Sequence, residues 1–344
     1  MDALERSTTE TAVISKLRAS VVIVTYNSAK YIDRCLESVL SNNPFEVMVV
    51  DNSSIDDTVE RIQNKFPGVT IIENDVNVGY GSAVNIGVEG IRGDLLVVLN
   101  PDTMVEEGWL DNLINPIGSI DKAIVVPRIM VYDGTVINTC GNLDHFTGLS
   151  FTNGFGKNAE DMTDPLSVSG ISGACFAIMK EDFLQLGGFD KDFFLYMEDA
   201  ELSWRAHANG YSFIYAPRSV VYHDYKLNVN AEKLFRLENG RYYLLRKFLT
   251  NKDLVSIGPS LLMTELLSWG YAIKLGRSGI TYKTKTLKHW FSNPRSVQQV
   301  EYQKFLMKFD DKIPTDQLCY GFLDAMVKRW ANTVFVANYR ILTK

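Results

Sequence analysis

Short apolar runs alternate with amphipathic stretches between residues 20 and 100, and this alternation constrains the fold more than any other feature. The runs are rich in β-branched residues, as in strands buried on both faces of a sheet. They cover 21–24, 47–50, 69–72 and 95–99. Helical spacing of apolar residues, or a capping pattern, marks 28–41, 53–65 and 80–90. Strands that alternate with helices predict an α/β fold with a mostly parallel sheet and right-handed crossovers.

The remaining sequence changes in character twice. Residues 123–180 hold short apolar runs between Gly, Asn and Asp, which predict mixed or antiparallel strands and a long loop at about 140–168. A helix at about 198–208 and a strand at 212–215 follow. Beyond residue 230 the pattern is helical and amphipathic. We therefore expect a flexible tail at 1–18, an α/β domain at 19–228 and a helical region at 229–344.

Composition narrows the function classes. The 344 residues are 46% apolar and 22% charged, with a net charge of −6, so the chain is an ordinary globular protein without a dominant nucleic-acid partner. The N-terminus has no apolar core of signal-peptide length, which predicts a cytoplasmic protein. No two cysteines have the C-x-x-C spacing, so free thiols in a reducing compartment are expected. The four are Cys35, Cys140, Cys175 and Cys319.

Polar residues follow three of the predicted strands: Thr25-Tyr26-Asn27, then Asp51, then Asn100-Pro101-Asp102. Ligands of open α/β sheets bind beyond the carboxyl ends of the strands, so this placement predicts a binding site. The alternative is that loops are simply polar. Asp102 is the candidate ligand for a divalent metal ion, because hard cations prefer oxygen ligands. The alternative is that Asn100-Pro101-Asp102 only forms a turn. Asp51 is suited to accept hydrogen bonds from a base or ribose, or to cap the next helix.

Glu198 and Asp199 lie side by side at the predicted start of a helix, after an aromatic-rich loop. A helix N-terminus lowers a carboxyl pKa and an apolar environment raises it. Such a pair suits a general base. Arg205 lies two turns further along the helix and is placed to orient the carboxylates or contact a phosphate. The alternative is a capped surface helix with an ordinary salt bridge.

Two other features are weaker. His223 follows a short apolar run, where a neutral imidazole could complete a metal site, although a lone histidine is more often structural. Gly79-Tyr80-Gly81 with Gly87 begins like a dinucleotide fingerprint. Val84 occupies the place of its third glycine, and the segment follows the third strand instead of the first, so a nicotinamide enzyme is disfavoured.

Taken together, these segments resemble the family 2 glycosyltransferases of the GT-A fold, and especially their rhamnosyltransferase-like branch. They span about residues 20–225 in the family's order. The segments are VVIVTYNSAKYIDRCLESVL, VMVVDNSSIDDT, ENDVNVGYGSAVNIGV, LLVVLNPDT, ISGACFAIMK and GGFDKDFFLYMEDAELSWRAHANGY.

The resemblance implies a role for each position. Family members invert the anomeric centre in one displacement, with Asp199 of the Glu198-Asp199 pair as general base. The 100–102 segment takes the place of the family's D-x-D motif, with Asp102 on Mg²⁺ or Mn²⁺ and His223 near the metal or diphosphate. Residues 170–175 would line the donor-sugar and acceptor side. The nucleotide would be surrounded by Thr25, Tyr26, Asn27, Asp51, Asn77, Gly79 and Asn85.

The chain departs from the family pattern in two places. Asn100 replaces the first acid of D-x-D, so metal binding would depend more on the diphosphate. Glu201 stands where many relatives carry Asp, which leaves open an exchange of roles among Glu198, Asp199 and Glu201. The Q-x-x-R-W motif of processive synthases is not visible near 205–250, so we expect one or a few additions.

The helical region alternates basic and apolar residues over 231–250, is largely apolar over 254–275, and then carries Lys274, Arg277, Lys283, Lys285 and Lys288. This pattern fits an interfacial helix pair at the inner face of the cell membrane, or a helical subdomain or homo-oligomer interface.

The expected donor is dTDP-rhamnose or a UDP-hexose, ahead of GDP-mannose, and the expected acceptor is a glycan or lipid-linked glycan. One rival is a sugar nucleotidylyltransferase, which would need a Gly-rich basic loop after the first strand. Another is a catalytically inactive nucleotide-sugar-binding or scaffold protein, suggested by Asn100.

Overall fold

The computed structural model describes residues 17–163, 168–292, 302–318 and 321–344. Almost all of the predicted tail and Cys319 therefore lie outside the described residues. The chain forms two compact units. The first comprises residues 1–142 and 152–225, and the second comprises 143–151 and 226–344.

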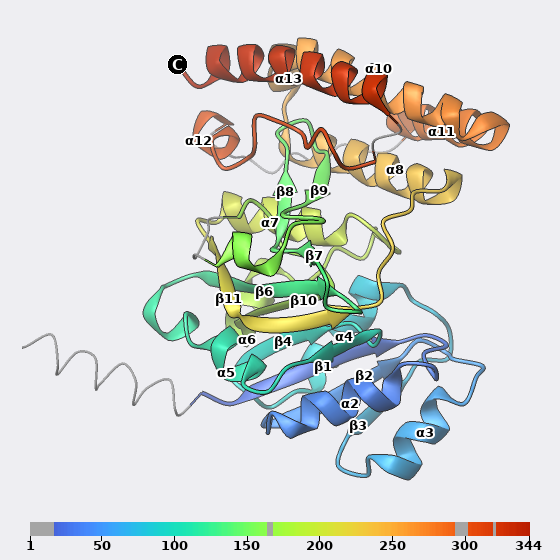
Figure 1. Cartoon of the computed structure of the whole chain (residues 1–344), viewed down its shortest axis with the longest axis vertical. Coiled ribbons are helices and arrows are strands. Elements are labelled where there is room, and N and C mark those ends of the chain that lie inside the picture. Colours follow the sequence, from blue (N-terminus) through green and yellow to red (C-terminus); the bar gives the residue numbers. More distant parts are fainter. Residues whose placement is uncertain (1–16, 164–167, 293–301, 319–320) are drawn as a thin grey trace, which may run out of the picture. The chain divides into compact units, whose positions relative to one another are not determined.

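Nine of the described strands in the first unit form one sheet, in the order β3-β2-β1-β4-β10-β6-β11-β5, with β7 paired to β6 (Figure 1). The strands β3, β2, β1 and β4 are parallel, as predicted, and β10 runs antiparallel between β4 and β6. Their bounds are β1 Ala19–Thr25, β2 Glu46–Asp51, β3 Thr70–Glu73, β4 Leu95–Leu99, β5 Thr103–Val105, β6 Ala123–Val131, β7 Ile137–Thr139, β10 Cys175–Met179 and β11 Ser212–His223.

Alternate residues of the central strands enter two different cores, one on each face of the sheet. Val22 and Val98 pack with α4 on one face, whereas Val21 and Val97 pack with α2 and α5 on the other. Burial on both faces explains the continuous apolar runs in the sequence. The helices of this unit are α2 Ile32–Ser41, α3 Thr58–Lys65, α4 Tyr80–Gly90, α5 Trp109–Ile114, α6 Lys180–Leu186 and α7 Glu198–Ala208, with 3₁₀ turns at Ile117–Ser119 and Ala159–Met162.

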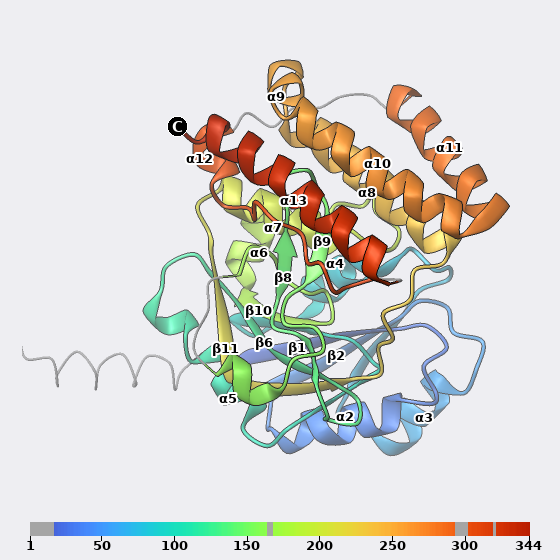
Figure 2. The same ribbon diagram turned by 45° about the horizontal axis from the view of Figure 1, so that its top comes forward.

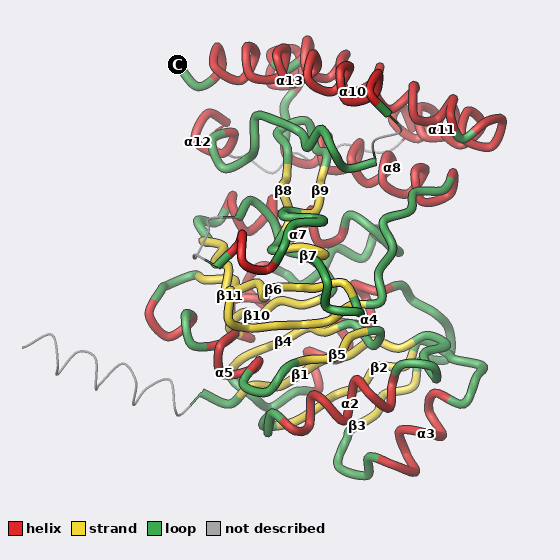
Figure 3. The backbone as a smooth tube through the Cα atoms, viewed as in Figure 1, coloured by secondary structure: helices red, strands yellow, loops and turns green. Residues whose placement is uncertain are grey.

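Two elements differ from the expectations (Figure 3). The strand predicted at 212–215 continues to His223 as β11, with a register shift between Ala216 and Val220. The segment at 140–168 is not one long loop: it contains a two-stranded sheet of β8 Asn142–Asp144 and β9 Ser150–Thr152. The connection between these strands, with the adjoining residues 143–151, belongs to the second unit.

The second unit consists of helices around this hairpin (Figure 2). Within it, α8 packs on α11, and α10 contacts both α11 and α13. The helices are α8 Ala231–Phe248, α9 Asn251–Ser256, α10 Gly258–Lys274, α11 Gly276–Ser292, α12 Tyr302–Leu306 and α13 Phe322–Leu342. Among the described residues, no helix is both long and apolar enough to cross a membrane.

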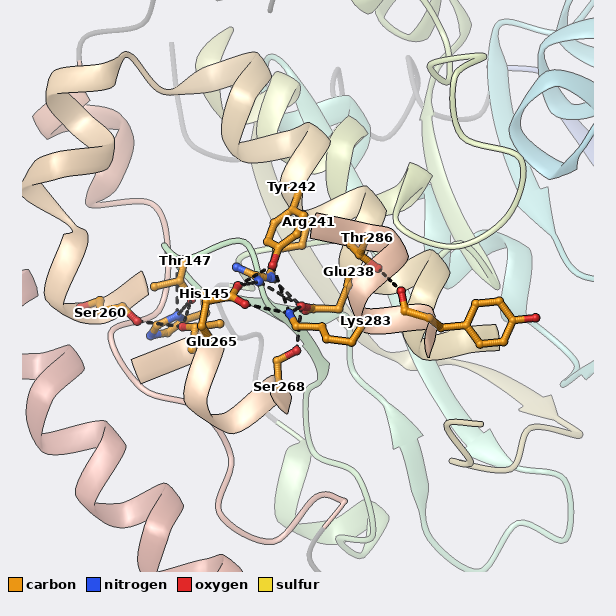
Figure 4. Close-up of polar contacts among 12 residues, drawn as sticks. His145, Thr147, Glu238, Arg241, Tyr242, Ser260, Glu265, Ser268, Lys283 and Thr286 are labelled. Atoms are coloured by element: carbon orange, nitrogen blue, oxygen red, sulfur yellow. Dashed lines mark hydrogen bonds and ion pairs between the residues drawn. The ribbon is translucent and has the colours of Figure 1, made fainter. Parts of the chain in front are cut away.

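A buried ionic network joins α8, α10 and α11 (Figure 4). Glu238 accepts hydrogen bonds from Arg241 at 2.9 Å and from Ser268 at 2.7 Å, and it also pairs with Lys283. Glu265 pairs with both cations. Burial alone would raise the pKa of Glu238, but Arg241 and Lys283 outweigh it and lower that pKa to about 2. The expectation that Lys283 offers surface charge is therefore wrong, because its side chain is enclosed in this network.

Candidate functional site

The carboxyl ends of β1 and β2 are joined by a hydrogen bond between Thr25 and Asp51. The two residues lie opposite each other in the parallel register, and the Thr25 hydroxyl donates to Asp51 Oδ1 at 2.7 Å. Ser54 adds two bonds, from its hydroxyl to Oδ1 at 2.6 Å and from its N–H to Oδ2 at 2.7 Å. A carboxylate offers about four acceptor positions, so Asp51 can accept one further bond while it holds the loop after β2.

Residues 26–28 form a turn that is held by the loop after β2. Asn27 has φ 53°, its N–H donates to the Ser54 hydroxyl at 2.8 Å, and its Oδ1 accepts from the Ile55 N–H at 2.9 Å. The ring of Tyr26 remains 53% exposed at the end of β1. The structure thus brings Tyr26, Asn27 and Asp51 together at one end of the sheet.

The 77–85 segment is fitted closely to the loop that precedes α7. Asn77 Oδ1 accepts from the Gly79 N–H at 2.9 Å, and the Tyr80 N–H donates to the Phe194 carbonyl at 3.0 Å. Gly79 has φ +88°, and a Cβ there would lie 2.5 Å from the Phe194 oxygen, so only glycine fits. Asn85 exchanges two 2.8 Å hydrogen bonds with the backbone of Phe189. Its amide therefore positions this loop.

Asp102 and His223 face each other across the neighbouring strands β5 and β11. Asp102 Oδ1 lies 3.3 Å from His223 Nε2, and His223 Nδ1 lies 3.3 Å from Asn138 Oδ1 on β7. Within the described structure, Asp102 Oδ1 and the buried Asn100 Oδ1 accept no hydrogen bond. When Nδ1 carries the proton and donates to Asn138, the Nε2 lone pair is directed at the Asp102 carboxylate, an arrangement that favours a cation between them.

These residues fit a divalent metal with few protein ligands. A carboxylate oxygen and an imidazole nitrogen are both ordinary ligands of Mn²⁺ and related ions. Among the described residues, no group of three or more His, Cys, Asp or Glu side chains could hold a metal ion. At this place the described residues offer two such ligands, Asp102 and His223, which is consistent with the lost charge at Asn100.

Glu198 is buried and Asp199 is half-buried at the N-terminus of α7. Asp199 Oδ2 accepts from the Gly173 N–H at 3.2 Å and from the Asn142 amide at 3.4 Å, and Oδ1 accepts from the Ala200 N–H at 2.9 Å. Glu198 Oε2 has no hydrogen-bond partner in the described structure. Burial raises the pKa of both carboxyls, and the charge of Asp199 raises that of Glu198 further.

The backbone before this pair is strained. Tyr196 and Met197 have φ 70° and 72°, left-handed values that non-glycine residues rarely adopt. Such strain costs free energy and is concentrated at functional sites. Here it turns the chain so that α7 begins at Glu198 and its free N–H groups lie beside the carboxylates.

Tyr80 lies near the Glu198-Asp199 pair. Its hydroxyl donates to the Gly173 carbonyl at 2.5 Å. Burial raises the pKa of Tyr80 well above its usual value, and the charges of Glu198, Asp199 and Asp102 add to the effect. Gly173 in turn donates its N–H to Asp199, so Tyr80 is linked to that carboxylate through one residue.

Arg205 has partners other than those that the sequence suggested. Its guanidinium forms a fork with Glu201, with a 2.9 Å bond from Nε to Oε1, and donates to the Leu186 carbonyl at the end of α6. Both side chains are buried. These contacts hold α7 against α6 and do not place Arg205 on Glu198 or Asp199. They also occupy both carboxylate oxygens of Glu201.

The sequence did not single out Asn138, Asn142 or Tyr80 as site residues. Asn138 lies on a three-residue strand, and Asn142 lies near the start of the segment expected to be a loop, so no periodicity marked them. Tyr80 is the first residue of α4, and its place in the glycine-rich segment 79–81 was the available signal.

Known proteins resemble this chain in sequence and in fold. Residues 20–187 match the model of the family described as Glycosyl transferase family 2. The chain is 29% identical over 229 residues to N-acetylglucosaminyl-diphospho-decaprenol L-rhamnosyltransferase of Mycobacterium tuberculosis, an alignment that covers 59% of this chain and 75% of that protein.

Two solved structures are similar in fold. S. aureus TarS 1-349 in complex with UDP-GlcNAc is 16% identical with a TM-score of 0.54, and the match covers 95% of this chain and 90% of that one. GalNAc-T7 with UDP, GalNAc and Mn²⁺ is 19% identical with a TM-score of 0.58, covering 80% of this chain and 56% of that one.

Proposed function

Residues 20–187 are a family 2 glycosyltransferase domain of the GT-A fold and the chain is a glycosyltransferase, and from this we propose that it is inverting and metal-dependent. The donor would be a nucleotide-diphosphate sugar, with dTDP-rhamnose or a UDP-sugar favoured. The acceptor would be a hydroxyl of a glycan or lipid-linked glycan, as the name of the mycobacterial relative suggests. A peripheral contact with the inner face of the membrane would suit such an acceptor.

The observation that carries this proposal is the 3.3 Å approach of Asp102 Oδ1 to His223 Nε2, in the same unit as the Glu198 and Asp199 carboxylates. Asp102 and His223 would hold Mg²⁺ or Mn²⁺ together with oxygens of the donor diphosphate. A divalent cation bound there would offset the negative charge that collects on the leaving diphosphate. Asn100 Oδ1, buried and without a hydrogen bond in the described structure, is available to a donor hydroxyl.

The base in this proposal is Asp199. Three N–H donors from Gly173, Ala200 and Asn142 favour its ionised form, whereas Glu198 lacks a partner on Oε2 and retains a proton more readily. As the acceptor oxygen bonds to the anomeric carbon, Asp199 takes the hydroxyl proton. The bond from that carbon to the phosphate oxygen breaks, and its electron pair leaves with the diphosphate.

The nucleotide would lie at the carboxyl ends of β1 and β2. Asp51 has one acceptor position left for a base N–H or a ribose hydroxyl, and the exposed ring of Tyr26 can lie against the base. Thr25, Asn27, Asn77 and Gly79 would shape this end of the pocket. Thr25 bonds to Asp51, Asn27 bonds to the loop after β2, and Asn77 bonds to Gly79, which lies against Phe194.

The test is a panel of nucleotide sugars with Mg²⁺ or Mn²⁺, read as thermal stabilisation and nucleotide release. Asp102→Ala should lose metal-dependent stabilisation and release, whereas Asp199→Asn should still bind the donor but not transfer. Asp121→Ala, an exposed carboxylate of the same unit, is the matched control. If Asp102→Ala keeps its metal response, the metal assignment fails. If no donor binds wild type with either metal, the inactive scaffold alternative replaces this proposal.

A further inference from the structure

Helix α10 leaves an apolar stripe uncovered. Leu262, Leu266 and Ile273 are 64%, 57% and 61% exposed, and they recur at intervals of four and seven residues along one face. The opposite face is buried and carries Ser260, Met263, Thr264, Ser268 and Ala272. An amphipathic helix normally buries its apolar side. Helix α10 instead exposes apolar residues on its outer side.

Helix α13 repeats this arrangement. Leu323, Met326, Trp330 and Ile341 are exposed along one side, with Trp330 at 59%, while Ala331, Phe335 and Asn338 are buried. Exposed residues at positions 323, 326, 330, 337 and 341 follow the helical period. The outward stripe therefore includes a tryptophan, the residue most typical of a membrane interface.

The two stripes face the same way. Figures 1 and 2 show α10 and α13 as neighbours, and the Ser260 hydroxyl donates to Asn338 Oδ1 at 2.7 Å where they meet. The hairpin at 143–151 contacts the buried side of both helices: Thr147 bonds to Thr264, and the His145 ring lies 4.6 Å from that of Phe335. Because the hairpin supports both helices, their exposed stripes form one surface on the opposite side.

Cations border this surface. A hollow of about 400 Å³ on α13 is lined by Lys312, Arg329 and Arg340, together with polar and small apolar residues. Arg329 and Arg340 directly adjoin Trp330 and Ile341 in the sequence. None of the three cations forms an ion pair within the described part of the chain. The hollow is thus suited to anionic oxygens beside an apolar surface.

Charge decides which partner fits. Without the buried Lys283, residues 254–344 hold 12 Lys and Arg against 6 Asp and Glu, although the whole chain has 35 against 41. A second copy docked through this same face would bring two cationic surfaces together. An anionic bilayer attracts such a surface and accepts its apolar side chains at the level of the headgroups.

We propose that the exposed face of α10 and α13 docks on an anionic membrane surface, with the apolar stripes inserted and Lys312, Arg329 and Arg340 at lipid phosphates. This inference rests on the proposed peripheral location and not on the proposed chemistry. It keeps α10, which falls within the predicted 254–275 stretch, and replaces the 231–250 stretch by α13, since α8 carries Glu238 and Arg241 of the buried ionic network.

The test is co-sedimentation of the full chain with phosphatidylcholine vesicles that contain or lack phosphatidylglycerol. Wild type should bind the anionic vesicles at least about tenfold more strongly. Leu262→Ser/Leu266→Ser/Trp330→Ser and, separately, Arg329→Gln/Arg340→Gln should each weaken that binding by about tenfold or more. Leu184→Ser, which alters an exposed apolar residue of the other unit, and Arg218→Gln/Lys157→Gln, which removes two exposed cations there, should bind as wild type does.

Thermal unfolding and donor stabilisation check that every variant is folded, so failure to bind vesicles is distinguishable from failure of the proposed chemistry. The proposal is overturned if wild type binds vesicles with and without phosphatidylglycerol equally. It is also overturned if the α10 and α13 variants bind as strongly as the control variants. It is equally overturned if the triple variant only dissociates a dimer, measured by light scattering, because the face then contacts a second copy.

Discussion

Glu198 and Asp199 are adjacent in sequence, but their environments differ. Asp199 has three N–H donors and Glu198 Oε2 has no partner in the described structure, so the two carboxyls should divide the roles of base and proton holder. This division suggests opposite responses to amide substitution.

Asp199→Asn should lower kcat by about 10²–10⁴-fold, because it removes the base. Glu198→Gln should remain within about tenfold of wild type at neutral pH, because the amide resembles the protonated acid. In wild type, kcat should rise with pH as Asp199 loses its proton. Because burial raises the Asp199 pKa, this rise should occur above the usual range of an aspartate. Profiles of kcat against pH test this. The reverse ranking of the two variants would make Glu198 the base.

The close approach of Gly79 to the Phe194 carbonyl can be tested by adding a Cβ atom at residue 79. Gly79→Ala should lower the free energy of unfolding by about 1–3 kcal/mol, since φ is +88° and the new Cβ would approach the Phe194 carbonyl to 2.5 Å. Gly68→Ala is the matched control, because its Cβ would meet nothing within 4 Å and its φ is not in the left-handed region. Urea unfolding measures both. Equal effects of the two substitutions would contradict the close approach.

At the scale of elements, the α8–α10–α11 network suggests a strong dependence on Lys283. Lys283→Ala should destabilise the protein by about 3–5 kcal/mol, because it leaves the buried Glu238 with one cation fewer. Lys285→Ala changes an exposed lysine of the same helix and should shift the unfolding midpoint little. Thermal unfolding compares them. A small effect of Lys283→Ala would mean that water or a rearranged Arg241 replaces the ammonium.

Local patterns predicted some elements closely and others not at all. The helices at 80–90 and 198–208 have the bounds expected, because apolar spacing and flanking Gly or polar residues marked them. The strand β11 was cut short because Pro217 and Arg218 interrupt its apolar pattern, where the register shifts. The hairpin of β8 and β9 was missed because each strand has only three residues, and its neighbours in space come from a distant part of the chain.

The same contrast applies to the site. Asp102 and His223 could be paired only through the resemblance, since 121 positions of sequence separate them and the pairing of β5 with β11 brings them together. Arg205 was assigned to the site from helical spacing alone. Helical spacing predicts which side of the helix Arg205 occupies, but it does not predict its partner. In the structure, Glu201, four residues earlier, forms the ion pair with the Arg205 guanidinium.

For the whole molecule, the path of the chain between its two units suggests a truncation experiment. A protein that ends at Tyr225 would keep the first unit but leave the 143–151 hairpin without its helices. Phe146, fully buried against Phe335 and Tyr339, would become exposed. We expect this truncated protein to aggregate, and a version with Phe146→Ser to be more soluble, as size-exclusion chromatography would show. A monomeric, folded truncation with the native hairpin would contradict this.

The crossing of the chain into the helical unit at 143–151 also bears on how such a protein can change over generations. A part attached by a single linker can be gained, lost or exchanged through one recombination event. Here the helices enclose a segment that originates inside the other unit, so a foreign helical region joined at residue 226 would meet a hairpin shaped for different neighbours. The two units are therefore expected to be inherited together, with their sequences adapting in step at Phe146, His145 and the helices that cover them.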